Sequence, residues 1–434
     1  MAGGDLVSRI QELRKQMYDD HLQEAVRRAS PATELAMKKA RKFGLGGLGL
    51  NAKMAIRNAS GTGFGTLTEG AAFPAAGFQS GINPTVTCAH FAATVQWPGH
   101  VVAMGSSKEA SFQTGTVIKQ NLKDLRDDIV KYIKRMLMWD GTSILGRTAA
   151  ASGTTGGYIT LTSASMPIEG FEAGQILTLR DAASGGTEKL TNAAATNPGG
   201  RILQIRRDTS PPQIVLTDAT GATAGGGDYV AWANVYDTTV ISGLRAWVNN
   251  TGTFMGLDRA TGANAAMRSY LRDAGAAALQ PDDADVLRDK VADIFSTSGT
   301  EGENYNHTWL GSRRTRRSLV NTTRGAVRFQ KIMDQAVGTP SIQVNDKDGP
   351  KEFLADPMLL DTELFVIDFS KVCYGSPEGM EGAKMVENNG SPLFQGRVND
   401  MPADFQTSHA TWRGNFGMDD CQAAGLLYNY TPST

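Results

Sequence analysis

The histidines are the residues best suited to acid–base or metal chemistry in this chain, and their positions argue against both. None has a second histidine or a cysteine at the spacing of metal ligands. The chain contains no HExxH, CxxC, GxSxG or GxxxxGK[ST] pattern. The five histidines are His21, His90, His100, His307 and His409. We therefore expect no catalytic residue, no metal site and no cofactor, and we predict that the protein is not an enzyme.

One glycine motif matches a phosphate-binding pattern but lies in the wrong context. Gly44, Gly46 and Gly49 satisfy GxGxxG. In a dinucleotide site this motif follows a strand and opens a helix, so that the pyrophosphate meets the helix N-terminus. Here a basic helix is expected before the motif and an extended segment after it. We therefore interpret the glycines as a flexible hinge.

Basic side chains gather in two places and could contact phosphates or acidic protein surfaces. Residues 27–57 hold eight basic residues and one acidic residue. The first set of candidates is Arg27, Arg28, Lys38, Lys39, Arg41 and Lys42, and the second is Arg313, Arg314, Arg316 and Arg317. For the first set, interior DNA contacts and subunit or solvent contacts stay open. For the second, we favour contacts at a subunit boundary, facing the seven acids of 282–303.

Composition places the chain among intracellular proteins with an ordinary globular core. Its 434 residues have a net charge of −1 and include 49 glycines. Three widely spaced cysteines fit a reduced compartment better than a disulfide framework. The N-terminal residues are too charged for a signal peptide, and no run of about 18 apolar residues exists. We expect a cytoplasmic protein without membrane contact.

The first hundred residues predict an arm and not a compact domain. Residues 5–43 have helix-like spacing, with a break near Ser30-Pro31, and the hinge at 44–49 follows. Residues 51–104 carry few charges and little periodicity, which is typical of a segment that becomes ordered against a partner. Within it, Thr85 to Gln96 has the pattern of a long hairpin.

The next segment changes character sharply. Apolar residues recur every three or four positions from about 107 to 138, which predicts a long amphipathic helix that Asp140-Gly141 ends. Residues 148–240 then alternate between short apolar runs and turn residues. This pattern predicts an inserted antiparallel sandwich or barrel.

The rest of the chain predicts a mixed α/β region. We expect a helix from Ala260 to Leu279 and a second helix that Asp282 caps. Buried strands are expected at 308–310 and 364–367, with a basic helix or turn over 313–329. Two or three strands should finish the chain, with a hairpin turn at Asn389-Gly390.

The order of these elements resembles that of the Hong Kong 97-type major capsid proteins of tailed phages. Two phrases strengthen the resemblance: residues 122–128 leading to Trp139-Asp140-Gly141-Thr142, and residues 241–245 leading to 250–253. The resemblance implies an α+β fold. It divides the chain into a helical arm at 1–50, an extended loop at 51–105, the spine helix of a peripheral domain at 106–147, a β-rich insertion domain at 148–242, an axial domain at 243–383 and C-terminal strands of the peripheral domain at 384–434.

The resemblance also implies a function. Such a protein assembles with itself into hexamers and pentamers of an icosahedral shell, in the host cytoplasm, and encloses double-stranded DNA through sequence-independent contacts. Scaffold, portal and decoration proteins are the further partners of the family. The alternative is an encapsulin, a bacterial compartment shell with the same fold that packages cargo enzymes.

Two features of some family members are not expected here. Only about 43 helical residues precede the hinge, so we predict no removable scaffolding segment and a separate scaffold protein or none. Lys108 lies near the end of the extended loop, but nothing singles out an asparagine partner or a catalytic acid. We therefore predict no isopeptide cross-link.

Overall fold

A computed structural model gives the conformation of most of the chain, apart from its first thirty residues and several internal segments. The residues that it describes are 31–39, 41–45, 51–59, 73, 77, 80–98, 111–149, 158–190, 200–209, 211–216, 227–233, 235–236, 240–292, 306–323, 330–333, 340–346, 349–377, 382–386, 394–398 and 401–432. The fold is mixed α+β and divides into two compact units. The first unit comprises 1–52, 86–134 and 373–416, and the second comprises 53–85, 135–372 and 417–434.

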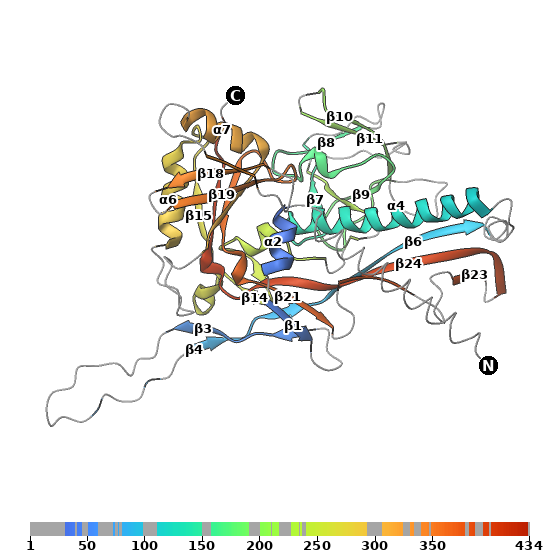
Figure 1. Cartoon of the computed structure of the whole chain (residues 1–434), viewed down its shortest axis with the longest axis horizontal. Helices are drawn as coiled ribbons and strands as arrows, with labels where there is room; N and C mark the ends of the chain where they lie inside the picture. The colour runs from blue at the N-terminus through green and yellow to red at the C-terminus, as the bar shows by residue number, and fades with distance from the viewer. Residues whose placement is uncertain are drawn as a thin grey trace. The chain divides into compact units, whose positions relative to one another are not determined.

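A six-stranded sheet forms the frame of the first unit (Figure 1). Its strands are β1 (Arg41–Leu45), β21 (Val372–Pro377), β24 (Met401–Met418), β22 (Gly382–Met385), β23 (Phe394–Val398) and β6 (Ala89–Pro98). The long strand β24 pairs with β6 over ten residues, from Phe405↔Pro98 to Gly414↔Ala89. This ribbon joins segments that lie about three hundred residues apart in the sequence.

The helix predicted for 107–138 is confirmed as α4 (Ser111–Leu137). Its apolar residues share one face, where Leu125, Ile129 and Ile133 are buried. In the first unit this face packs on the β6–β24 ribbon, where the rings of Phe91 and Tyr132 lie 4.6 Å apart. A shorter helix, α2 (Pro31–Lys39), belongs to the same unit.

A six-stranded antiparallel barrel forms one part of the second unit. Its strands are β7 (Ile144–Arg147), β8 (Tyr158–Thr160), β9 (Ile176–Arg180), β10 (Gly200–Arg206), β11 (Gln213–Leu216) and β12 (Tyr229–Trp232), hydrogen-bonded in the order β7-β12-β9-β10-β11-β8. The ends of β7 and β8 also pair, because Ala149 N donates to Thr160 O at 2.8 Å and Thr162 N donates to Arg147 O at 2.9 Å. This last pairing closes the sheet into a barrel. The barrel begins at residue 144, four residues before the insertion that the sequence predicts.

Apolar residues of the barrel strands fill its interior. Buried members include Leu145, Ile159, Leu177, Ile202 and Val230. Burial alternates along β8 and the first half of β10, since successive side chains of a strand point to opposite faces, whereas β9, β11 and β12 each bury three successive residues.

A seven-stranded mixed sheet forms the rest of the second unit. Its strands, in hydrogen-bonded order, are β15 (Tyr270–Asp273), β25 (Ala424–Tyr428), β20 (Glu363–Ile367), β16 (Thr308–Gly311), β19 (Gly349–Ala355), β18 (Pro340–Asp346) and β17 (Gln330–Met333). The pairs β15–β25 and β16–β19 are parallel. Helix α6 (Pro281–Ala292) lies against β15, β25 and β20, while α7 (Arg313–Thr323) lies against β19 and contacts α6.

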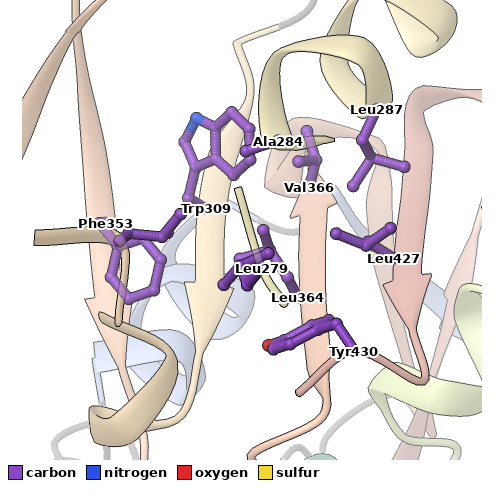
Figure 2. Close-up of a cluster of buried hydrophobic side chains, with 10 residues drawn as sticks. Leu279, Ala284, Leu287, Trp309, Phe353, Leu364, Val366, Leu427 and Tyr430 are labelled. Atoms are coloured by element: carbon purple, nitrogen blue, oxygen red, sulfur yellow. The ribbon is translucent and has the colours of Figure 1, made fainter. Parts of the chain in front are cut away.

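The core under these helices is a cluster of buried apolar side chains (Figure 2). Leu287 of α6 and Leu427 of β25 meet Val366 of β20 there, and Trp309 packs near Phe353. The cluster draws on strands from three separate parts of the sequence. The C-terminal strand is therefore needed to complete the core of the second unit.

Short elements connect the larger ones. They are β2 (Asn51–Lys53), β3 (Ile56–Ala59), β4 (Ser80–Ile82), β5 (Thr85–Thr87), α5 (Leu244–Trp247), β13 (Thr253–Phe254), β14 (Leu257–Asp258) and the 3-10 helices η1 (Ile168–Gly170), η2 (Gly262–Met267), η4 (Phe369–Lys371) and η5 (Cys421–Ala423). Strands β3 and β4 pair antiparallel. Among the described helices, none is long and apolar enough to cross a membrane.

The helix predicted from Ala260 to Leu279 is wrong. The segment forms η2, then strand β15, and then a turn in which Gly275 has φ +60°. Alanine-rich composition favours a helix only weakly, and the parallel pairing of β15 with β25 outweighs that preference.

Three predictions for the first hundred residues also need correction. Helix α2 ends at Lys39, and residues 41–45 form β1 beside β21, so the expected helix to 43 and a hinge starting at Gly44 are both wrong there. The remaining hinge glycines and the helix before residue 31 lie outside the described residues. Thr85 to Gln96 does not fold on itself as a hairpin, because β6 pairs with β24.

The end of the chain departs from the expected division into domains. All of 384–434 was assigned to the peripheral domain, but β25 pairs with β15 and β20 of the second unit. The Asn389-Gly390 turn lies outside the described residues. Strands expected at 308–310 and 364–367 are confirmed within a residue or two, and strands β8 to β12 fall within the segment 148–240, where a small antiparallel sandwich or barrel was expected.

Candidate functional site: an assembly surface

Three arginines of the second predicted cluster form a basic surface at the start of α7. Arg313, Arg314 and Arg317 are exposed, and Arg316 is half-buried. The helix begins where it does because the buried Ser312 hydroxyl accepts hydrogen bonds from Arg314 N at 3.1 Å and Thr315 N at 3.0 Å. The arginines therefore follow directly after a fixed helix cap.

The buried side of α7 anchors this surface to the core. Thr315 Oγ1 lies 2.7 Å from the Tyr430 hydroxyl and 3.2 Å from Asp361 O. Burial raises the pKa of the Tyr430 hydroxyl, with a smaller opposing effect from its bond to Thr315. Because both side chains are buried, the position of α7 on the sheet is well defined.

Arginine is an unfavourable residue type at this end of a helix. The N-terminus of a helix carries a partial positive charge, so cations in the first turn destabilise it. Three of the first four positions of α7 are nevertheless arginines. Stability of the isolated copy does not explain them, which points to a partner with negative charge.

Acidic residues of α6 lie on the neighbouring helix, as the sequence predicted, but the described ion pairs do not join the two helices. Asp283 pairs with Arg272 at 2.8 Å and Asp289 with Arg288 at 3.0 Å. Arg314 lies 3.7 Å from Asp361, and both side chains are about half exposed. Asp282 does not cap α6, because Gln280 precedes the helix and Asp283 Oδ2 accepts from Gln280 N at 3.2 Å.

The first basic set is only partly described. Lys38 and Lys39 form the end of α2, while Arg41 and Lys42 begin β1 opposite residues 373–374 of β21. Arg27 and Arg28 lie outside the described residues. The four placed residues therefore fall on two different elements and not on one helix.

The two sequence phrases quoted for the resemblance meet in the second unit, at the junction between α4 and α5. Arg245 N donates to Trp139 O at 3.1 Å, and the guanidinium lies 4.3 Å from the Trp139 ring centroid. Arg245 also pairs with Glu363 of β20 at 2.7 Å, and both side chains are largely buried. Burial raises the pKa of Glu363, and Arg245 opposes this shift. The contacts of Arg245 thus fix how the end of α4 joins the seven-stranded sheet of the second unit.

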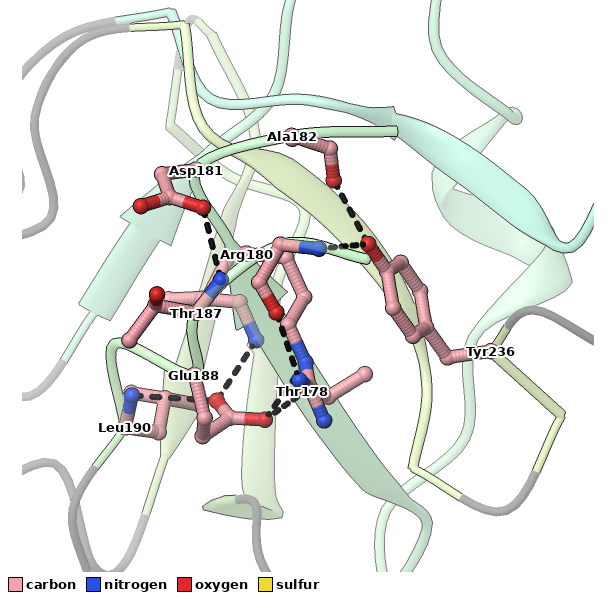
Figure 3. A network of polar contacts seen from close by, with 10 residues as sticks. Thr178, Arg180, Asp181, Ala182, Thr187, Glu188, Leu190 and Tyr236 are labelled. Atoms are coloured by element: carbon pink, nitrogen blue, oxygen red, sulfur yellow. Dashed lines mark hydrogen bonds and ion pairs between the residues drawn. The ribbon is translucent and has the colours of Figure 1, made fainter. Parts of the chain in front are cut away.

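A polar network in the barrel has a structural explanation (Figure 3). Glu188 accepts hydrogen bonds from two backbone N–H groups and from Thr178, and it pairs with Arg180 at 3.2 Å. Arg180 stacks on Tyr236, whose hydroxyl accepts from Gly186 N at 2.9 Å and donates to Ala182 O at 2.8 Å. Burial raises the pKa of Glu188, and its backbone donors oppose the shift. The network holds the turn at 181–187 closed.

The three described histidines, His90, His307 and His409, do not come together. His307 is buried, whereas His90 and His409 lie on the β6–β24 ribbon beside Arg413 and Thr94 respectively. His21 and His100 lie outside the described residues. In the part of the chain that is described, no group of three or more His, Cys, Asp or Glu side chains could hold a metal ion.

The similar solved structures include several protein shells. One is the capsid asymmetric unit of cyanophage A-1(L), with 11% identity, coverage of 93% of both chains and a TM-score of 0.49. The capsid of a native GTA particle shows 9% identity and a TM-score of 0.40, covering 92% of this chain and 91% of the other. An encapsulin complex from Synechococcus elongatus shows 7% identity and a TM-score of 0.40, covering 92% and 88%. No protein-family model and no curated protein matches the chain.

Proposed function

We propose that the chain is the major capsid protein of a tailed phage, which assembles with itself into hexamers and pentamers of an icosahedral shell around double-stranded DNA. The observation that carries the proposal is the arrangement of elements along the chain. An antiparallel ribbon, β3–β4, precedes the amphipathic helix α4. A barrel, a mixed sheet and the long returning strand β24 follow.

The base of the β3–β4 ribbon supports the assignment of 51–105 as an arm that contacts other copies. Asn58 accepts a hydrogen bond from Ala266 N at 3.4 Å, and Thr85 N donates to Met255 O at 2.7 Å, so both ends of the ribbon are held on the second unit. Phe73, between the two strands, is 84% exposed. Covering so exposed a phenylalanine with a neighbouring copy would lower the free energy of the assembly.

In this proposal the remaining parts take the roles that the resemblance gives them. Helix α4 is the spine of the peripheral domain, the barrel is the insertion domain, and the mixed sheet with α6 and α7 is the axial domain. The virion capsid is the location of the mature protein. Scaffold, portal and decoration proteins are its further partners.

An encapsulin is the alternative function, and the basic residues argue for the phage capsid. Lys38, Lys39, Arg41 and Lys42 give the segment after residue 30 a positive charge that suits a DNA-filled interior. Particles made in a phage-infected or recombinant host should therefore protect double-stranded DNA from nuclease. Particles that instead contain a single cargo enzyme and no DNA would favour the encapsulin.

The basic segment gives a second test of the same proposal. Reversing the charge of Lys38, Lys39, Arg41 and Lys42 should lower the amount of DNA retained, because each neutralised phosphate contact contributes to binding. The loss should be larger at low salt than at high salt. DNA retention that is unchanged at every salt concentration would remove this segment from the DNA contacts.

A further inference from the structure

We propose that the exposed acidic face of α6 in one copy binds the arginine cluster of α7 in the next copy. The contact runs head to tail and repeats around a ring of copies. This inference rests on the proposed shell function and adds the residues that join neighbouring subunits.

The acidic face of α6 is defined by Asp282, Asp285 and Val286. Positions three and four apart share one side of a helix, so these residues lie together. Both aspartates are exposed, and Val286 is 39% exposed between them. The opposite side of α6, with Ala284, Leu287 and Val291, is buried. The exposed face therefore combines negative charge with an apolar centre, as a protein contact does.

The arginine cluster of α7 is the complementary surface. Arg313, Arg314 and Arg317 are all exposed and follow the Ser312 cap, in the turn where positive charge destabilises a helix. Among the described residues, no carboxylate pairs with Arg313 or Arg317. A second copy would supply the missing negative charge.

DNA fits this cluster less well than a second copy does. Helix α6 contacts α7 in the same unit, so the exposed Asp282 and Asp285 lie on the helix beside the arginines. Their charge repels a phosphate backbone that approaches this layer. The acidic face of another copy spans only residues 282–286 and can meet α7 alone, whereas a phosphate backbone continues past α7 over the aspartates of α6.

The position of the two surfaces predicts the symmetry of the contact. Helix α6, whose outer side carries the acidic face, lies over β15, β25 and β20, whereas α7 lies over β19 on the other part of the same sheet. A contact in which α6 of one copy meets α7 of the next, without the reverse contact between the same two copies, is heterologous, and such contacts generate closed rings when the rotation closes. Pentamers and hexamers need a contact of this kind.

Charge reversal on each side tests the contact. The variants are Arg313→Glu with Arg317→Glu, Asp282→Arg with Asp285→Arg, and the two pairs combined, each expressed with any scaffold protein that the wild type requires. Each reversed pair alone should lower the shell yield by roughly tenfold at low salt, because attraction becomes repulsion at every subunit boundary. The combined variant should recover to within about threefold of wild type, since the charges are exchanged and not removed.

Controls separate this contact from folding and from the shell proposal. Arg206→Glu with Arg207→Glu places the same charge change on exposed residues of the barrel and should leave the yield unchanged. Thermal unfolding identifies any variant that fails to fold, and the reversal on the other helix then tests the contact. If wild type forms no shell, the proposed function fails. If wild type forms shells and both reversed pairs do too, or if the α7 reversal reduces only DNA retention, the contact is contradicted.

Discussion

Gly243 is the residue with the least room for a side chain in the junction between α4 and α5. A Cβ there would lie 2.3 Å from both Met136 O and Trp139 O, and these are backbone atoms that cannot move aside cheaply. We expect Gly243→Ala to lower the free energy of unfolding by about 3 kcal/mol, at the upper end of the range for overpacking. Chemical denaturation of the unassembled chain measures the change.

A matched control is available in the same unit. A Cβ at Gly262 would meet no heavy atom within 4 Å, and its backbone has an ordinary φ. Gly262→Ala should therefore change the free energy of unfolding by less than about 1 kcal/mol. Equal effects of the two substitutions would show that the junction tolerates a side chain at Gly243.

Cys421 gives a prediction for the pH dependence of stability. Burial raises the pKa of its thiol from 9.0 to about 11, and Arg259, whose guanidinium lies 3.9 Å from the sulfur, opposes this shift. The unfolded chain loses this proton at lower pH than the folded chain. The contribution of the neutral Cys421 thiol to the free energy of unfolding is therefore fully present below pH 9 and is lost as the pH rises toward 11.

The measurement compares wild type with Cys421→Ala across this range. Lysines and tyrosines titrate in both proteins, so only the difference between the two curves reports on Cys421. We expect the wild type to lose more stability than the variant between pH 9 and 11. Parallel curves would contradict the assignment of a buried neutral thiol.

The residues that carry the proposed contacts were only partly predictable from the sequence. Runs such as Arg313-Arg314 and the acids after residue 281 are visible as charge patterns. Which of them are exposed depends on the face that each helix buries, and that required the positions of Leu287 and Thr315 in the core. The sequence does not reveal the steric role of Gly243, although this residue lies within the segment 241–245 that carries the resemblance.

At the scale of elements, Arg135 ties the last turn of α4 to the barrel. Its side chain is 5% exposed, pairs with Glu172 at 3.0 Å and lies 6.0 Å from the ring centroid of Trp232. Removing one partner of a buried pair leaves an uncompensated charge, whereas an apolar replacement of the buried ion removes that charge. The two halves of this pair should therefore differ when mutated.

We expect Glu172→Ala to lower the free energy of unfolding by about 2 kcal/mol, below the usual range for buried pairs because Glu172 is 41% exposed. Arg135→Met should change it by about 1 kcal/mol or less. Denaturation curves of the two variants provide the comparison. If Arg135→Met lowers the free energy of unfolding more than Glu172→Ala does, the contacts of the arginine side chain matter more than its pairing with Glu172.

Elements with a strong local pattern were predicted well. The helix α4 and the barrel strands follow directly from apolar residues at period 3.6 and period two. The segment 260–279 was misread because its alanines favour a helix locally, while its pairing partner β25 lies more than 150 residues further along the chain. Local preference cannot reveal such a partner.

At the scale of the whole molecule, local sequence preference also fails to reveal which distant segments pair. The pairing of β6 with β24, the closure of the barrel by β7 and β8, and the place of β25 in the mixed sheet all join distant segments. The order of elements nevertheless predicted a shell protein, because that order is longer and more specific than any single motif. The proposed function depends on surfaces between copies, which one copy does not contain.

Shell assembly is the property that decides whether the chain is a capsid protein. The chain is expressed alone and together with the neighbouring head proteins of its source, purified without denaturant and imaged by negative-stain electron microscopy. We expect closed particles of uniform diameter with fivefold and sixfold clusters of subunits on their surface. Folded monomers that form no particle under either condition would contradict it.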